Sequence, residues 1–180
     1  MKNKNPNKLE KEGKTAFKKG NFEVAQNLFH EAEQSYLANN EILAAAEMAN
    51  NRSVALLQSG DASSALEVVD GTDEIFAEAG DRRRQALAIG NKAAALEELE
   101  SLDEAAEAYE ISANLLKEIG EDDMRASVMQ SLSAVQIKQG LQLQALATMH
   151  SGIEGIKHPN PKQRVVKKIL QVPFSFLNRK

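Results

Sequence analysis

Glycine or asparagine recurs every twenty residues over most of this 180-residue chain. Five of the ten glycines stand in this register, and Glu100 is its one member of another type. The register reads Gly20, Asn40, Gly60, Gly80, Glu100, Gly120, Gly140 and Asn160. Glycine and asparagine often end helices because they tolerate the left-handed backbone conformation. Such even spacing predicts one structural unit repeated along the chain.

Small residues form two further series with a spacing of forty. The first is Ala25, Ala65, Ala105 and Ala145, and the second is Gly13, Ser53, Ala93 and Ser133. Packed helices lie about 8–10 Å apart and need small side chains where their backbones come closest. We therefore expect each forty-residue unit to be a pair of helices that meet at these positions.

Proline is confined to the two ends of the chain, so the middle can form unbroken helices. We expect helices over residues 6–19, 22–38, 41–59, 61–78, 82–99, 102–118, 122–139 and 142–156, and a shorter one over 161–171. Asn21, Asp61 and Ser101 should act as helix N-caps, and Ser101 with Glu104 should form a capping box. Asn5 should likewise cap a helix that starts at Pro6.

Composition limits where and how the chain can work. It contains no cysteine, so neither a disulfide framework nor a cysteine zinc site is expected, and a cytoplasmic location fits. The start of the chain is basic but has no apolar stretch, so we expect no signal peptide. No run approaches eighteen apolar residues, so we expect no transmembrane segment.

Charge is divided unevenly along the chain. Residues 1–19 carry seven lysines and two acids, a net charge of +5, and residues 157–180 carry seven basic residues and no acid. The middle carries eight basic and twenty-four acidic residues, a net charge of −16. An acidic body argues against nucleic acid and would attract a basic peptide or surface. The alternative is that the acids only solvate the exterior of the helices.

No pattern for catalysis or for a cofactor is present. The phosphate-binding, nucleophile-elbow and zinc-helix motifs are all missing, and the many Glu pairs show no sign of burial. His30 and His150 hold equivalent positions in separate repeats, and His150 with Glu154 is better explained as a surface contact than as a metal site. We therefore expect a protein that is not an enzyme and holds no metal or cofactor.

The first forty residues resemble the tetratricopeptide repeat. The matching residues are Leu9, Gly13, Gly20, Asn21, Phe22, Ala25, Phe29 and Ala32. The usual period of that family is 34 residues, and this chain is similar to its forty-residue variants in scaffolds of signalling and polarity complexes. The resemblance implies an all-α fold, a right-handed α-α superhelix of four helix pairs plus a C-terminal helix. The single domain would hold repeats at about 6–40, 41–80, 81–120 and 121–160, followed by residues 161–180.

The resemblance also implies a peptide or helix bound in the concave groove that the first helix of each pair builds. Asn51 and Asn91 match the asparagine that holds the bound peptide in this family, whereas Lys11 and Ser131 replace it in the outer repeats. The alternative is that these asparagines are surface residues or bond within the solenoid. The candidate groove residues are Glu47, Asn50, Asn51, Leu87, Asn91, Glu98, Gln130 and Ser131.

The chaperone-binding members of the family hold a C-terminal carboxylate in a basic clamp. The corresponding positions here are Glu10, Lys14, Asn51, Leu87 and Asn91. Glu10 has the wrong sign, and Leu87 and Asn91 lack the charge. We therefore do not expect capture of a chaperone's C-terminus.

The C-terminal segment leaves several interpretations open. Residues 161–171 place Val165, Val166, Ile169 and Leu170 on one face, which suits a helix that caps the last repeat. Beyond it, Phe174, Phe176 and Leu177 stand beside basic residues. That tail could contact a membrane surface, enter the groove of its own or another copy, or bind a partner. The expected function is a protein-binding scaffold, with a self-associating or membrane-peripheral protein as the alternative.

Overall fold

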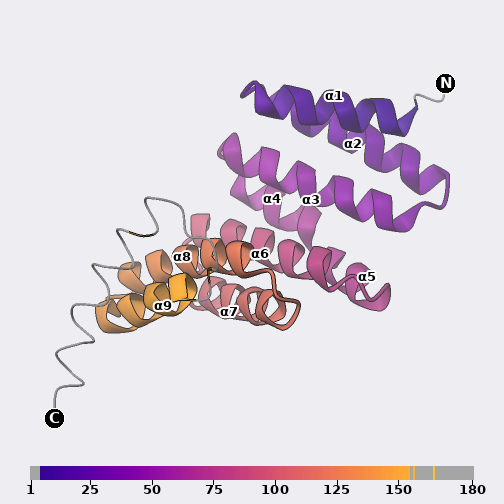
Figure 1. The fold of residues 1–180 in the computed structure, drawn as a ribbon. Coiled ribbons are helices and arrows are strands. Elements are labelled where there is room, and N and C mark those ends of the chain that lie inside the picture. Colours follow the sequence, from indigo (N-terminus) through magenta and orange to yellow (C-terminus); the bar gives the residue numbers. More distant parts are fainter. Residues whose placement is uncertain (1–4, 155, 157–163, 165–180) are drawn as a thin grey trace, which may run out of the picture.

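A computed structural model describes residues 5–154, 156 and 164. All regular secondary structure in those residues is helical, as expected (Figure 1). The helices are α1 (Pro6–Lys18), α2 (Phe22–Ala38), α3 (Ile42–Gln58), α4 (Ala62–Val69), α5 (Thr72–Glu78), α6 (Arg82–Glu98), α7 (Leu102–Glu118), α8 (Asp122–Lys138) and α9 (Gln142–Glu154). The helix expected over 161–171 and the tail residues Phe174, Phe176 and Leu177 lie outside the described residues.

The helices follow one another through the molecule in chain order, from α1 at one end to α9 at the other (Figure 1). From α1 to α4 and from α5 to α9, each helix packs against the next, and α6 also contacts α3, α4 and α8. We call α1, α3, α6 and α8 the first helices, and α2, α4 with α5, α7 and α9 the second helices. None of the described helices is both long and apolar enough to cross a bilayer.

The twenty-residue register is a register of backbone conformation. Each member from Gly20 to Gly140 has a positive φ, including Asn40 at 62° and Glu100 at 61°. Beyond Glu100, the N–H of Ser101 donates to the carbonyl of Leu96 at 3.0 Å, which closes the end of α6. Glu100 is therefore an exception in residue type only, because the chain takes the same left-handed corner there.

The helix expected over 61–78 is wrong, because the chain breaks inside it. Asp70 is extended, with ψ at 134°, and Gly71 takes a left-handed φ of 74°. The hydroxyl of Thr72 donates to the carbonyl of Val69 at 2.7 Å and so stabilises the corner between α4 and α5. Asp–Gly is a recognised turn signal.

The two series of small residues lie where the paired helices meet, as predicted. Ala25, Ala65 and Ala105 are completely buried. Serine adds a hydrogen bond at the same contact: the Ser53 hydroxyl donates to the carbonyl of Ala65 at 2.9 Å. The Ser133 hydroxyl makes the equivalent bond to Ala145 at 3.0 Å. These small residues therefore let the helices of each pair pack closely. In two pairs the serine adds a buried hydrogen bond.

The predicted caps are confirmed in part. The side chains of Asn5 and Asp61 accept from backbone N–H groups of their helices, at 3.0 Å in both cases. Asn21 and Ser101 stand at N-cap positions but make no side-chain capping bond, so the capping box at Ser101 is wrong. Asp81 caps α6 instead, by accepting from the N–H of Arg84 at 2.9 Å.

Candidate functional site

Ion pairs connect the first helices to one another. Lys14 of α1 lies 3.8 Å from Glu47 of α3, and Glu47 lies 3.6 Å from Arg84 of α6. Lys138 of α8 lies 2.9 Å from Glu97 of α6. These side chains bring all four first helices onto one polar surface, which we call the first-helix face. Such partly exposed pairs add little stability, so their main effect is to order the face.

Tyr36 and Glu10 anchor the α1 end of this face. The Tyr36 hydroxyl lies 2.9 Å from both Glu10 and Asn7, and Lys14 donates to Glu10. Burial alone would raise the pKa of Glu10, but the hydrogen bonds from Lys14 and Tyr36 and the charge of Lys14 together lower it. Burial first, and then Glu10, raises the pKa of Tyr36 to about 12. At neutral pH the site therefore holds a carboxylate and a neutral phenol.

The predicted groove asparagines do not behave alike. The side-chain amide of Asn91 donates to the Asn50 carbonyl oxygen at 3.1 Å, and the amide of Asn50 donates to the backbone carbonyl of Ala46 at 3.0 Å. For Asn91 the structure therefore shows a bond within the fold, the alternative that the sequence left open. Asn51 differs, because its buried Nδ2 has no acceptor among the described residues.

The other predicted site residues are only partly brought together. Glu47 takes part in the ion pairs that join α1, α3 and α6. Ser131 is half-buried and interacts with Tyr109. Leu87, Glu98 and Gln130 are exposed, and no hydrogen bond between them and the asparagines is present in the described residues.

A small hollow opens where α1, α2 and α3 meet. Its volume is about 170 Å³, and we call it the α1–α3 slot. Its lining residues are Lys14, Phe17, Lys18, Phe29, Asn51 and Val54. The sequence singled out only Lys14 and Asn51 as site candidates. On α1, Phe17 and Lys18 stand three and four positions after Lys14, a spacing that places both beside Lys14 on the helix and could have identified them.

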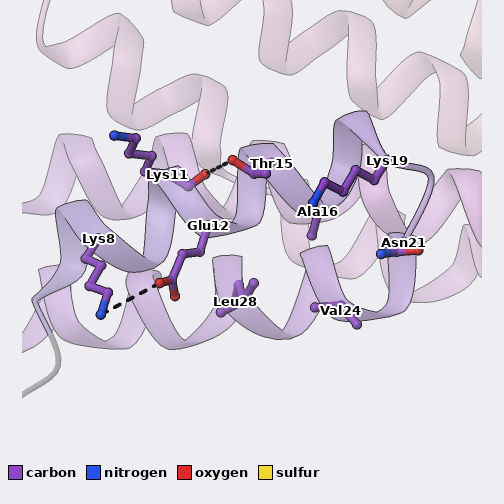
Figure 2. A pocket seen from close by; sticks show the side chains of 9 residues that line it. All are labelled: Lys8, Lys11, Glu12, Thr15, Ala16, Lys19, Asn21, Val24 and Leu28. Carbon is purple, nitrogen blue, oxygen red and sulfur yellow. Dashed lines mark hydrogen bonds and ion pairs between the residues drawn. The ribbon is translucent and has the colours of Figure 1, made fainter.

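Two wider hollows lie along α1. One, of about 470 Å³, adjoins the slot through Lys14 and Lys18 and continues to Asn7 and Lys11. The other, of about 580 Å³, lies between α1 and α2, where lysine side chains surround Val24 and Leu28 (Figure 2). Both are open, and neither contains a set of groups arranged for catalysis.

The acidic excess of the chain lies on the second helices. These helices carry thirteen Asp or Glu and a single lysine. The first helices carry eleven Lys or Arg and seven acids. The first helices therefore have a small basic excess over their whole length. The charged residues named on the first-helix face are balanced, with Glu10, Glu47 and Glu97 against Lys14, Arg84 and Lys138.

The histidines lie among ordinary polar contacts. His30 lies 3.1 Å from Arg52 and 3.8 Å from Glu33, and His150 lies 3.9 Å from Glu154. Within the described residues, no group of three or more His, Cys, Asp or Glu is placed to hold a metal ion.

No protein-family model matches the chain, and no curated protein matches it. The tetratricopeptide resemblance therefore stays a prediction that rests on the spacing of residues. The helical architecture and the packing of consecutive helices stand on the structure itself.

Proposed function

We propose that this chain is a non-enzymatic protein-interaction module that binds an extended or helical peptide on its first-helix face. One observation carries the proposal: ion pairs between side chains link the four successive first helices across one polar surface. The resemblance to tetratricopeptide repeats points to the same face.

The sequence predicted a basic partner, but the charged residues named on the first-helix face are balanced in sign. A basic peptide on the first-helix face would meet no excess of acid there. A basic partner would fit the second helices better, where acids outnumber lysine thirteen to one.

Site-specific photo-crosslinking tests which face binds. A photoreactive amino acid is placed at Leu87, exposed on α6, or at the control position Ile111, exposed on α7. Partners from the native host are then identified by mass spectrometry. We expect specific crosslinks from Leu87 and none from Ile111. Crosslinks from Ile111 alone would overturn the proposal.

Substitution of the two asparagines separates their roles. Asn51→Ala should weaken binding of a crosslinked partner and leave the helical circular dichroism unchanged. Asn91→Ala should act less on binding, because Asn91 already bonds to Asn50. Unchanged binding in the Asn51→Ala, Asn91→Ala double variant would contradict binding through these asparagines.

The second candidate function is self-association or membrane-surface binding through the C-terminal tail. It is favoured by the net charge of +7 in residues 157–180, together with Phe174, Phe176 and Leu177. Deletion of residues 172–180 should then abolish binding to anionic vesicles or lower the oligomeric mass. If neither changes, the tail has no such role.

A further inference from the structure

The hollow between α1 and α2 lies on a side of the first repeat that is covered by a helix in the second repeat (Figure 2). On α3, Met48 and Ala55 pack in the core that α3 shares with α2. Forty residues earlier, the same side of α1 carries Lys8 and Thr15, and both line the hollow. All residues that line it belong to α1, α2 or the corner between them. The place that a preceding helix would take is therefore open among the described residues.

The α2 side of this hollow is more apolar than the repeat pattern requires. Val24 is 52% exposed. The equivalent residues of the later repeats are all polar, namely Ser64, Glu104 and Gln144. Leu28 is half-buried one turn further on, and its equivalents are all smaller, namely Val68, Ala108 and Thr148. A terminal face that needed only to be solvated would be polar, whereas apolar residues inside a polar rim are typical of a binding surface.

The rim of the hollow is positively charged. Three lysines line it, Lys8, Lys11 and Lys19, against the single acid Glu12. Lys8 lies 3.8 Å from Glu12. Lys11 and Lys19 are exposed and make no ion pair with any described residue. The rim therefore has two ammonium groups available to carboxylates of a ligand.

Shape and charge together select the occupant. Residues 157–180 carry seven basic residues and no acid, so the lysines would repel this part of the chain. A membrane surface takes up apolar side chains that project, whereas Val24 and Leu28 line a hollow. The helix that packs on the equivalent side of α3 is itself acidic, because α2 carries three glutamates and no lysine or arginine. An acidic amphipathic helix fits both the shape of the hollow and its charge.

We propose that the hollow between α1 and α2 docks an amphipathic helix of a partner protein, whose apolar face is bounded by Asp or Glu. The apolar face packs on Val24 and Leu28, and the carboxylates pair with Lys11 and Lys19. The hollow includes none of the residues whose ion pairs join the first helices. It is therefore a second binding surface, independent of the proposed function.

Three dye-labelled helical peptides test the charge and the apolar face. Each is as long as α2 and carries a side-chain lactam bridge, because short helices are marginal in isolation. The first has a leucine and valine face bounded by glutamates. The second has lysine in place of every glutamate, and the third keeps the glutamates but distributes the apolar residues around the helix. Fluorescence anisotropy measures their binding to the full chain.

We expect the first peptide to bind at least tenfold more tightly than the second and the third. Its affinity should also fall as salt is added, because exposed ion pairs are screened. Equal affinity for the first and second peptides, or no binding of the first, would overturn the proposal.

Paired variants locate the binding. Lys19→Glu reverses a charge on the rim, whereas Lys18→Glu makes the same change at a residue that lines the α1–α3 slot instead. Val24→Ser introduces the residue of the second repeat, whereas Leu37→Ser removes an exposed apolar side chain of α2 outside the hollow. All four positions are exposed, so the helical circular dichroism should stay unchanged.

Lys19→Glu and Val24→Ser should each weaken binding of the first peptide at least fivefold. Lys18→Glu and Leu37→Ser, the matched controls, should each change it less than twofold. Wild-type affinity in both Lys19→Glu and Val24→Ser would place the peptide elsewhere and overturn the proposal.

Two further measurements test the other occupants. Sedimentation velocity detects a second copy of the chain, and flotation with phosphatidylserine vesicles detects a membrane surface. We expect neither result to change in Lys19→Glu or Val24→Ser. Self-association or vesicle binding that both variants abolish, without binding of the first peptide, would overturn docking of an acidic helix.

This inference and the proposed function fail separately. If native partners crosslink to Leu87 but the first peptide does not bind, the inference fails and the proposed function stands. If the first peptide binds in the hollow but partners crosslink only to Ile111, the reverse holds.

Discussion

One side of α1 and the equivalent side of α3 occupy the same place in successive repeats. This side is polar in α1 and apolar in α3. In α3, Met48 is 1% exposed and Ala55 is completely buried, and both pack in the core that α1, α2 and α3 share. Forty residues earlier, α1 has Lys8 and Thr15 in these places. Lys8 lies 3.8 Å from Glu12 in an exposed ion pair beside the hollow between α1 and α2 (Figure 2).

The difference shows that the type of residue at a given position of the repeat depends on whether another helix covers that position. Interior junctions bury this side of the helix under the preceding repeat, whereas the described structure places no helix before α1. A terminal repeat needs a polar outer face to stay soluble. The hollow of Figure 2 lies on a side of α1 that no described helix covers as α2 covers the equivalent side of α3.

Exchanging the buried apolar residue and the exposed polar one should change the free energy of unfolding most. Met48→Lys places an ammonium at a fully buried position without a partner, so it should lower the free energy of unfolding by about 3 kcal/mol or more. Lys8→Met is the matched reversal at the exposed end and should change it by less than about 0.5 kcal/mol. Urea unfolding followed by circular dichroism measures both. Similar losses in the two variants would contradict the comparison.

A larger side chain at a buried position should change the free energy of unfolding less. Ala55→Leu overpacks a position with no exposed surface and should cost about 1–3 kcal/mol. Thr15→Leu adds a leucine at the equivalent exposed position and should be close to neutral. The same unfolding experiment checks both variants. A stable Ala55→Leu protein would mean that the junction between α2 and α3 is looser than the structure shows.

The corner residue of the third repeat can be compared with the corners of the other repeats. Glu100 has a φ of 61°, whereas the corners at 20, 60, 80, 120 and 140 are glycine. Glu100→Gly should raise the free energy of unfolding by about 1 kcal/mol, because a left-handed backbone is strained in residues with a side chain. Glu98→Gly, at the last residue of α6, should lower it by less than about 1 kcal/mol. The thermal midpoints should shift in opposite directions, and a shift in the same direction would refute strain at residue 100.

The smallest expected change in stability occurs only in alkaline solution and involves Tyr36. Tyr36 packs in the junction of α1, α2 and α3, and its pKa is raised to about 12 from the ordinary value of 10.0. The unfolded chain therefore loses this proton first, so the contribution of Tyr36 to stability should be constant below pH 10 and fall as pH rises toward 12. Tyr36→Phe should remove this part of the slope. Unfolding free energies at pH 8 and pH 11 provide the measurement, and an unchanged slope would contradict the shift.

Sequence reasoning was most successful where local residues decide the structure. The corners and most helix bounds depend on glycine, asparagine and apolar spacing within a few residues, so they could be predicted. The break at Gly71 is also local, and its Asp–Gly signal stands in the sequence, but the prediction of one helix over 61–78 did not include it. The division of acids between first and second helices could also have been found, since it needs only the predicted helix ranges.

The candidate site was less predictable. Asn51 and Asn91 occupy equivalent positions and look alike in the sequence. Only the structure shows that Asn50 of a neighbouring helix accepts from Asn91, whereas the buried Nδ2 of Asn51 has no acceptor among the described residues. The slot itself depends on how three helices leave a hollow beside Phe29, which no local pattern encodes.

By itself, then, the sequence determined an all-α chain, its helical pairs and the close contacts within them, because helix ends and small-residue contacts are local. The tertiary structure decided which equivalent residues differ in role. Lys8 and Met48 differ because one lies at an end and the other inside, and Asn51 differs from Asn91 because its neighbours leave a donor unused. Both differences arise from contacts between helices, and those contacts depend on packing rather than on spacing along the chain.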